Sequence, residues 1–449
     1  MRPNILFILV DGLRADQCFG NDKKSHTPFL DSLLTKGPYF KNTYASADGT
    51  MISLNCTFNS KFQFETGIRS RKLILLEDNH IQNLKDSGYY ISGLIPNLTS
   101  LKPLQKYLQN NDCTFDNNPP YETLPTGMTQ RIMSLLNLLK NKQPWFCYIH
   151  LFDLHPLREG KKPLKIEEFE TKDFGNSLYS QTVSSVDHHL QKISEQVNFN
   201  NTLLILTADH GERIPYDDKA SFQFEPDFKL TKSIGKKILP DVAHNASGKL
   251  FGNIKKSLGN IRANQSNKQL TNSQKRSRDP YFTLSLYDEM LHIPFFISGL
   301  NLKSKIISKQ ISTLQIFPTI FSLTGISYRK TKYNESLVEL INGNDMIKKE
   351  IFLHTIPYEE KSPLDRIGLR TNKFKYFRNS HNAKKNVHLY DIENDPNENN
   401  NIAKNNPSMI QKMELTLEEI QQNSSKLEEQ LSEKEEKIIS EELKKMGYI

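Results

Sequence analysis

Cysteine is scarce in this chain, and the four that occur follow no pairing pattern. Cys18, Cys56, Cys113 and Cys147 are irregularly spaced, and no two of them form a Cys-x-x-Cys pair. This spacing excludes a disulfide-rich scaffold and a cysteine-based zinc module. It predicts free, mostly buried thiols in a protein of a reducing compartment.

Long apolar runs are also missing. No stretch approaches the ~18 consecutive apolar residues of a transmembrane helix, so we expect no membrane span. No signal-peptide pattern is visible either, because Met1 leads almost directly into the strand-like run Ile5–Val10. That run leads into the candidate site described below, and cleaving it would destroy the site. We therefore expect a cytoplasmic protein.

An excess of acidic residues is lacking, and the positive charge is concentrated in one segment. The 449 residues carry a formal net charge of +8. The segment from Lys219 to Arg278 has 13 Lys or Arg and 3 Asp or Glu, a net +10, so the rest of the chain is close to neutral or slightly acidic.

Residues 213–280, which contain this segment, show little apolar periodicity, which predicts an insertion or flap rather than a core element. Steering of an anionic substrate and a merely solvated flap are equally compatible with it. Nucleic acid is not the expected partner, since aromatics are few and no binding module is recognised.

Two short apolar runs, far apart in the chain, each end in an acidic motif. Asn4–Val10 is followed by Asp11, and Thr202–Thr207 by Ala-Asp209-His210-Gly-Glu. Both runs suit buried parallel strands, whose carboxyl ends meet at one edge of a sheet. Two carboxylates and an imidazole meeting there suit a divalent metal. Helix capping by the aspartates is the alternative, and the Asp-His-Gly-Glu cluster favours the metal.

Strand-like and helix-like stretches alternate through residues 1–212 and again after the basic segment. Such alternation predicts an α/β protein with a mostly parallel sheet flanked by helices. The expected strands, besides the two above, lie at 88–95, 145–152 and 292–297. The expected helices lie at 27–34, 128–139, 179–197 and 318–323.

The C-terminal part changes character. Residues 367–371, 374–378 and 387–392 predict a small antiparallel sheet with a tight turn at Asn372-Lys373. From Ser408 the chain is helical and charged, and a helix docked on its own domain is favoured over a coiled coil. We expect a catalytic domain at 1–325, an α+β subdomain at 326–407 and a helical tail at 408–449.

The motifs resemble those of the sulfatase family, in the alkaline phosphatase superfamily, from end to end and in the same order. Only the basic insertion and the tail lie outside the resemblance. It implies an alkaline-phosphatase-like sheet and an enzyme that attacks sulfate or phosphate esters with a metal-bound nucleophile. The motifs are Val10–Asp16, Thr27–Asp31, Phe40–Ala45, Thr207–Glu212, Leu286–Pro294, Ile316–Thr319, Leu369–Thr371, Lys375-Tyr376 and Leu389–Pro396.

The nucleophile position departs from the family pattern. Sulfatases carry a C-x-P-S-R motif whose Cys becomes formylglycine, and here the aligned stretch is Thr50–Leu54. Cys56 lies nearby but lacks the pattern that follows. A Thr cannot become formylglycine, but it can act as a metal-bound alkoxide. Family relatives with Thr here are typically phosphodiesterases, phosphonate hydrolases and phosphoethanolamine or phosphoglycerol transferases. A surface hydroxyl in a Gly-Thr turn is the alternative, which the surrounding motifs disfavour.

Two further departures from the family pattern concern residues that help bind sulfate in sulfatases. Gly12 stands where sulfatases usually have a second Asp, and Pro96-Asn97 replace a Lys-Trp-His-type motif. The resemblance then implies one divalent metal, with zinc or manganese favoured by the imidazole and calcium also compatible. Its ligands would be Asp11, Thr50, Asp209 and His210.

The stretch from Asp153 to Pro156 resembles the family's D-x-H-x-P loop. The resemblance makes His155 a catalytic and substrate-binding candidate that hydrogen-bonds a substrate oxygen or protonates the leaving alcohol. Asp153 is a substrate-binding candidate that orients His155 or contributes to a second metal. A loop histidine with a structural partner is an equal alternative. His292, within an apolar strand, is expected to be structural.

The expected function is that of a metal-dependent hydrolase or transferase acting on phosphate or sulfate esters through Thr50. A true sulfuric ester hydrolase and a catalytically degenerate binding protein are the alternatives. The substrate would be an anionic small-molecule, glycan or lipid-headgroup ester. Hydrolysis and transfer use the same nucleophile, so both stay open, and no oligomeric state follows from the residues.

Overall fold

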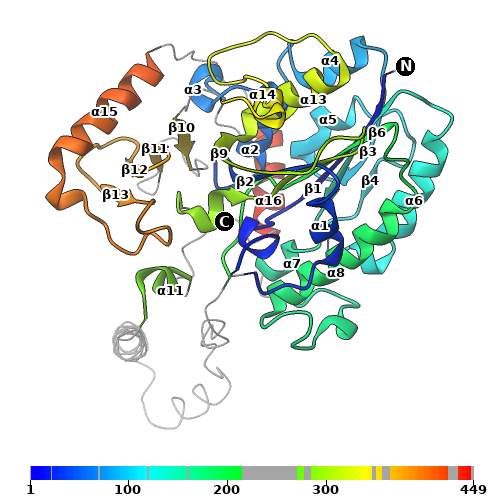
Figure 1. Ribbon diagram of the computed structural model, residues 1–449, viewed down its shortest axis with the longest axis horizontal. Coiled ribbons are helices and arrows are strands. Elements are labelled where there is room, and N and C mark those ends of the chain that lie inside the picture. Colours follow the sequence, from blue (N-terminus) through cyan, green and yellow to red (C-terminus); the bar gives the residue numbers. More distant parts are fainter. Residues whose placement is uncertain are drawn as a thin grey trace, which may run out of the picture.

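The computed structural model describes most of the chain. The described residues are 2–21, 23–68, 71–118, 121–158, 161–214, 270–277, 285–345, 350–355, 365–422 and 433–445. Figure 1 shows a large sheet flanked by helices and, beside it, a smaller C-terminal sheet carrying a helix. This is the α/β architecture with a small antiparallel sheet that the sequence predicts.

The large sheet is mixed but mostly parallel. Its order is β4-β3-β5-β1-β6-β8-β2-β7, with β9 paired to β2. The pairs β1–β5, β1–β6, β3–β5, β3–β4 and β2–β9 are parallel, whereas β6–β8, β2–β8 and β2–β7 are antiparallel. The strands are β1 Asn4–Val10, β2 Pro38–Tyr44, β3 Tyr90–Pro96, β4 Thr114–Phe115, β5 Trp145–Leu151, β6 Thr202–Thr207, β7 His292–Ile293, β8 Phe295–Ser298 and β9 Lys305–Ser312.

The prediction of a single strand at 292–297 is wrong. The segment is split into β7 and β8 on either side of Pro294. Proline has no N–H to donate to a ladder, so it ends one pairing before the next begins. The strand β7 pairs with β2, while β8 pairs mainly with β6.

Helices cover both faces of the large sheet (Figure 1). The first group is α1 Pro28–Leu33, α6 Met128–Leu139 and α8 Leu178–Ser194, and the second is α2 Thr50–Asn59, α4 His80–Asp86 and α13 Ile316–Thr324. Asp187 of α8 joins the first group by accepting N–H bonds from Phe29 and Leu30 at 3.0 and 2.8 Å. Shorter helices are α3 Gln63–Thr66, α5 Lys102–Gln105, α7 His155–Arg158, α12 Asp288–Leu291 and α14 Val338–Asn342.

An aromatic cluster fixes α2 on the sheet. Phe7 of β1 stacks on Phe317 of α13 at 5.5 Å between ring centroids. Phe58, near the end of α2, packs edge-on against Tyr148 of β5 at 5.4 Å. All four rings are buried. Because large apolar side chains dominate core energetics, this cluster sets where the start of α2, with Thr50, meets the sheet edge.

The small sheet is antiparallel, as predicted. Its order is β10 Ile351–His354, β11 Arg366–Arg370, β12 Phe374–Asn379 and β13 His388–Asp391. The helix α15, Pro407–Gln421, buries Leu417 and Ile420 in the same core as Leu369 and Phe377. This agrees with a helix docked on its own chain.

The helix α16, Glu433–Lys445, docks elsewhere. Glu435 pairs with Lys72 at 2.6 Å, and Glu442 accepts the Thr99 N–H at 3.1 Å. Ile439 is buried. Residues 423–432, which belong to the expected helical tail, lie outside the described residues.

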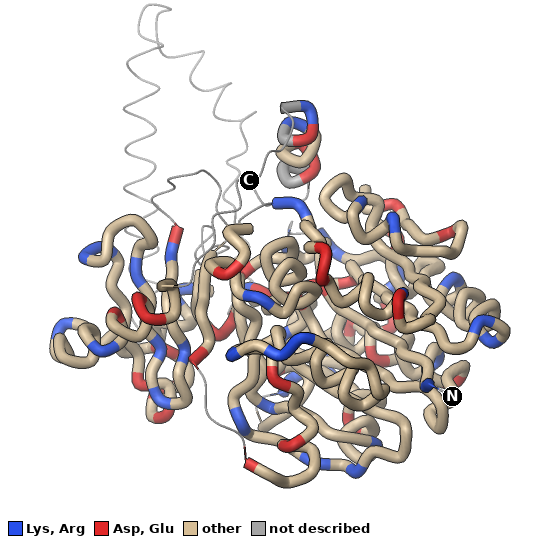
Figure 2. Tube along the Cα trace, turned by 90° about the horizontal axis from the view of Figure 1, so that it is seen from above, with Lys and Arg blue, Asp and Glu red and all other residues tan. Residues whose placement is uncertain are grey.

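Most of the basic insertion also lies outside the described residues, namely 215–269 and 278–280. The described helix α11, Asn272–Ser277, is held against the C-terminal part, where Arg276 pairs with Glu289 at 2.8 Å and donates to the Glu398 carbonyl at 2.8 Å. Elsewhere in the described chain, acidic and basic residues are interspersed (Figure 2).

The expectations from the few cysteines and from the lack of long apolar runs can be compared with the structure. The four cysteines are free and buried, as predicted. In the part of the chain that the structure describes, no helix has the length and apolarity that a membrane span requires.

Candidate metal and nucleophile site

The two acidic motifs meet at one edge of the large sheet, as their strands predict. The strands β1 and β6 are parallel neighbours, in register from Asn4 with Thr202 to Leu9 with Thr207. Asp11, Asp209 and His210 therefore follow adjacent strand ends. One ligand atom from each lies within 4.8 Å of the others, and all three residues are buried. Parallel pairing thus converts two distant motifs into one cluster.

Hydrogen bonds to the main chain orient His210. Its Nδ1 lies 2.6 Å from the Gly211 carbonyl oxygen, which can only accept, so Nδ1 carries the proton. In a neutral imidazole, Nε2 is then the unprotonated nitrogen, and it lies 3.5 Å from Asp209 Oδ2 and 3.9 Å from Asp11 Oδ1. A lone pair aimed at two carboxylates suits a metal ligand.

Two glycines allow the strand-end loops to approach this cluster. Gly12 has φ +71°, in the left-handed region that favours glycine. Its N–H donates to Asp209 Oδ1 at 3.2 Å. A Cβ on Gly211 would lie 2.2 Å from the Glu289 carbonyl oxygen, so a side chain there requires the backbone to move. Both glycines are therefore needed for this local geometry.

Thr50 joins the cluster from a third element. It is the first residue of α2, after an extended Gly49. Its Oγ1 lies 3.4 Å from Asp11 Oδ2 and 3.3 Å from His210 Nε2. The amino-terminal end of a helix carries partial positive charge, which favours an anion there. Ser53, one turn later, donates from its hydroxyl to the Asp209 carbonyl and ties α2 to the β6 end.

The electrostatics of the cluster fit a bound cation. Burial, reinforced by the charge of Asp209, raises the pKa of Asp11 well above its ordinary value, and Arg158 opposes this. Burial would also raise the pKa of Asp209, but His210 and then His150 hold it below its ordinary value. Two buried carboxylates repel each other unless a positive charge lies between them. The donor set of Asp11, Asp209 and His210, with Thr50 beside it, fits a divalent metal.

His155 and Asp153 lie beside this cluster but differ in their contacts. His155 Nδ1 is 3.9 Å from Asp11 Oδ2, and its ring stacks on Phe152 at 4.7 Å. Burial and then the charge of Arg158 lower the pKa of His155 well below its ordinary value. Asp153 accepts the Leu124 N–H at 2.8 Å, and burial raises its pKa to about 7. Asp153 thus fixes the 121–126 segment.

Three buried residues of the site carried no assigned role in the sequence. Glu212 and Arg158 pair at 2.7 Å, and their side chains are 5% and 4% exposed. His150 is fully buried on β5, opposite Leu9 of β1, and its Nδ1 lies 3.2 Å from the Tyr148 hydroxyl. Glu212 belongs to the Asp-His-Gly-Glu motif and His150 to a buried strand. Arg158 follows His155 by one helical turn, and only that spacing points to it.

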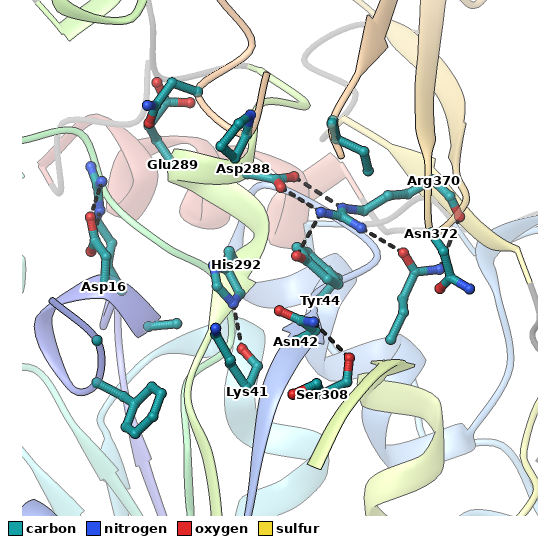
Figure 3. A pocket seen from close by; sticks show the side chains of 18 of the residues that line it. Asp16, Lys41, Asn42, Tyr44, Asp288, Glu289, His292, Ser308, Arg370 and Asn372 are labelled. Atoms are coloured by element: carbon teal, nitrogen blue, oxygen red, sulfur yellow. Dashed lines mark hydrogen bonds and ion pairs between the residues drawn. The ribbon is translucent and has the colours of Figure 1, made fainter. Parts of the chain in front are cut away.

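A cavity of about 1040 Å³ lies between the edge of the large sheet and the small sheet. Figure 3 shows its polar lining, in which His292 contacts the Lys41 carbonyl and Asn42 the Ser308 carbonyl. Arg14, three residues after Asp11, belongs to the wall of this cavity. His292 is thus a residue at the start of β7 whose hydrogen bond is to the backbone and whose ring stacks on Tyr44 at 4.9 Å.

An ion cluster joins the two sheets at the wall of this cavity. Asp288 receives Arg370 at 2.7 Å and Lys375 at 2.6 Å, and Arg370 lies over the Tyr44 ring at 3.5 Å (Figure 3). Lys375, fully buried, also pairs with Glu398 at 2.9 Å. Buried ion pairs of this kind fix relative placement, since removing one partner leaves a charge uncompensated.

Comparison with known proteins follows the same motifs. Residues 3–326 match the Sulfatase family, and residues 281–426 match the C-terminal region of N-sulphoglucosamine sulphohydrolase. The chain belongs to the sulfatase family. Delta 4,5-hexuronate-2-O-sulfatase of Bacteroides thetaiotaomicron is 30% identical over 478 residues, 90% of this chain and 85% of that protein. Arylsulfatase K of Bos taurus is 28% identical over 149 residues, 31% of this chain.

The match to some relatives is partial. This chain spans only 27% of the length of bovine arylsulfatase K and 32% of an uncharacterized protein of Haemophilus influenzae. Solved structures agree in fold. The phosphonate monoester hydrolase of Agrobacterium radiobacter has a TM-score of 0.63 at 14% identity, covering 93% of this chain and 95% of its own. A 2-O GAG sulfatase also has a TM-score of 0.63, at 16% identity, covering 94% and 92%.

Proposed function

We propose that this sulfatase-family protein is a metal-dependent enzyme that cleaves phosphate or sulfate esters with Thr50 as the nucleophile. The observation that carries the proposal is the position of Thr50 Oγ1, at 3.4 Å from Asp11 and 3.3 Å from His210 in a buried cluster. Membership of the sulfatase family supports ester cleavage. The substrate is an anionic ester, and the relatives named as hexuronate and GAG sulfatases favour a glycan.

The residues of the cluster have different proposed roles in ester cleavage. Asp11, Asp209 and His210 would hold a divalent cation, which when bound would supply positive charge that favours an ionised hydroxyl and offsets charge on the ester oxygens. Thr50 Oγ then forms a bond to phosphorus or sulfur as the bond to the leaving oxygen breaks. Water resolves the phospho- or sulfo-threonine in hydrolysis, and an acceptor hydroxyl does so in transfer. Zinc or manganese suits the imidazole ligand better than calcium does.

His155 acts on the substrate oxygens as a neutral imidazole. Its pKa is lowered by burial and by Arg158, which disfavours the charged form at neutral pH. A neutral ring donates one hydrogen bond, so His155 orients an ester oxygen or the leaving alcohol. Asp153, bonded to Leu124, supports the adjoining segment, and Tyr121 of that segment lies edge-on to the His155 ring at 6.2 Å.

Phosphate is favoured over sulfate first by the residue at the nucleophile position. Thr50 stands where the formylglycine-forming Cys of sulfatases would be, and a Thr cannot be converted into that group. A sulfate ester is the second candidate, and it is favoured by the hexuronate-2-O-sulfatase that is 30% identical along most of this chain. A screen of sulfate monoesters, phosphate monoesters, phosphodiesters and phosphonate monoesters with added zinc or manganese separates the two. Turnover of sulfate esters alone would overturn the ranking.

The role of Thr50 is tested by Thr50→Ala, with Thr57→Ala as the matched control. Thr57 is a buried Thr of the same helix, whose hydroxyl bonds the Ser53 carbonyl at 2.9 Å. We expect Thr50→Ala to reduce kcat by at least about 1000-fold, since the nucleophile is removed. Thr57→Ala should retain most of the activity. Full activity in Thr50→Ala would refute the assignment.

The metal is tested by direct binding. Purified protein should bind zinc or manganese near one equivalent by calorimetry. Asp209→Asn should weaken binding by more than the about 10- to 100-fold that the loss of an outer-shell partner costs. Metal binding that persists unchanged in Asp209→Asn would contradict the ligand set. If metal binds but no ester is turned over, the protein is a catalytically degenerate binding member of the family, and the proposed activity is wrong.

A further inference from the structure

A buried ion pair stands beside the cluster and has no role in the chemistry so far. Arg158 Nε lies 2.7 Å from Glu212 Oε2, and the two side chains are 4% and 5% exposed. Arg158 ends the short helix α7 that His155 begins. One helical turn places residues three apart on the same face, so Arg158 and His155 share a face of α7.

The pair adjoins the strand end that carries Asp11. A Cβ built on Gly12 would lie 3.5 Å from Glu212 Cβ and 3.6 Å from Oε2, so the Glu212 side chain packs directly on Gly12. Glu212 follows His210 by two residues. Arg158 is therefore held between the His155 helix and the ends of β1 and β6, and its charge lowers the pKa of both Asp11 and His155.

An anionic ester bound in this buried site needs cationic groups around its oxygens. A dication offsets the two carboxylates Asp11 and Asp209, and Arg158 offsets Glu212. An anionic ester and the oxygen of an ionised Thr50 then add negative charge to a buried site. Burying charge without a partner is costly, so cationic hydrogen-bond donors have to face the ester oxygens. A guanidinium carries five N–H donors, so an Arg held at Nε can also donate to a tetrahedral anion.

We propose that Arg158 binds the anionic oxygens of the ester substrate, with Glu212 as the positioning residue that holds the guanidinium. This rests on the proposed function, since it assigns a further residue to the same site. The ligand chemistry is a tetrahedral oxyanion, either phosphate or sulfate. The Lys-Trp-His-type motif of sulfatases is replaced in this chain by Pro96-Asn97, which leaves a need for another cation.

A purely structural pair is the competing explanation, and a double variant separates the two. Arg158→Met alone leaves the buried Glu212 carboxylate without its cationic partner, which destabilises the fold whichever explanation holds. Arg158→Met/Glu212→Gln removes both charges and should restore stability. A structural role predicts that the double variant recovers anion binding too. An anion-binding role predicts that it recovers stability only.

The probes are inorganic phosphate and sulfate, titrated by calorimetry into the metal-loaded protein and used as competitive inhibitors. Arg158→Lys keeps a charge without the planar fork. Arg378→Met is the matched control, because Arg378 forms a part-buried pair with Glu414 at 2.9 Å in the small sheet. We expect about 10- to 100-fold weaker phosphate binding in Arg158→Met/Glu212→Gln. We expect a smaller loss in Arg158→Lys and none in Arg378→Met.

Chemical rescue adds a second readout. Free guanidinium at millimolar concentration should partly restore kcat/KM in the double variant and leave wild-type kcat/KM unchanged. Wild-type phosphate affinity in the double variant, or no rescue together with unchanged KM, would overturn the role of Arg158 while leaving ester turnover intact. Conversely, the wild-type protein could bind phosphate through Arg158 but turn over no ester. That result would contradict the proposed function and support the anion site.

Discussion

The protonation of Asp153 offers a sharp test of the electrostatics beside the site. Its Oδ1 accepts the Leu124 N–H at 2.8 Å, while Oδ2 is buried and has no hydrogen-bond partner among the described residues. Burial raises the pKa of Asp153 from its ordinary 3.8 to about 7. The folded protein therefore retains this proton over a pH range in which the unfolded chain has lost it.

The sign of the effect on stability follows from that difference. Between about pH 4 and pH 7 the folded state binds more protons than the unfolded state, so stability falls as pH rises through this window. Each pKa unit corresponds to ~1.4 kcal/mol. Between pH 5 and pH 8 the Asp153 contribution should therefore decrease by about 3 kcal/mol, with most of the decrease complete by pH 7.

Asp153→Asn removes the titration but keeps an oxygen that accepts the Leu124 N–H. Urea unfolding of the metal-free protein should show the variant gaining about 3 kcal/mol relative to wild type between pH 5 and pH 8. Asp86→Asn, at an exposed position, should show no such gain. A stability difference between Asp153→Asn and wild type that does not change with pH would refute the reasoning. If metal loading abolishes the gain, Asp153 is a ligand to a second cation instead.

Two further substitutions test the backbone and the ion cluster. Gly12→Ala should cost about 1–2 kcal/mol in urea unfolding because φ is +71°, and Gly12→Asn, which tolerates this region, should cost less; equal costs would contradict the strain argument. Lys375→Met should cost about 3–5 kcal/mol, because it leaves Asp288 and Glu398 buried together, and the added change Glu398→Gln should recover part of it. No recovery would mean that Lys375 acts through packing alone.

The parts of the fold that were predicted are those whose local pattern matches their burial. The runs at β1, β5 and β6 are mostly apolar and fully buried, so their identity as parallel strands is readable from the sequence. By contrast, β9 mixes lysine, serine and glutamine with isoleucine without a regular alternation, and β2 carries an exposed Lys41 near its middle. The pairing partners of β2 and β9 are distant in the sequence, and no local pattern predicts the pairing.

The candidate site divides in the same way. Asp11, Asp209 and His210 follow strand ends, so the topology of a parallel sheet brings them together. Thr50 is placed by a helix packed through Phe58, and only the family resemblance pointed to it. For Arg158 the only local signal is its spacing of one helical turn from His155, because its proposed role depends on α7 turning it toward Glu212 across the sheet edge.

Gly12 and the Arg158–Glu212 pair are best understood together. Sulfatases usually have a second Asp at the position of Gly12, and here that space is bordered by Glu212 at 3.5 Å from where a Cβ would lie. An Asp at position 12 would place a third carboxylate beside Glu212 and compete for Arg158. With glycine there, Glu212 can pack close and hold the guanidinium beside the cluster. With glycine at position 12 the site holds one carboxylate fewer than the sulfatase pattern, which suits a nucleophile that must itself become an anion.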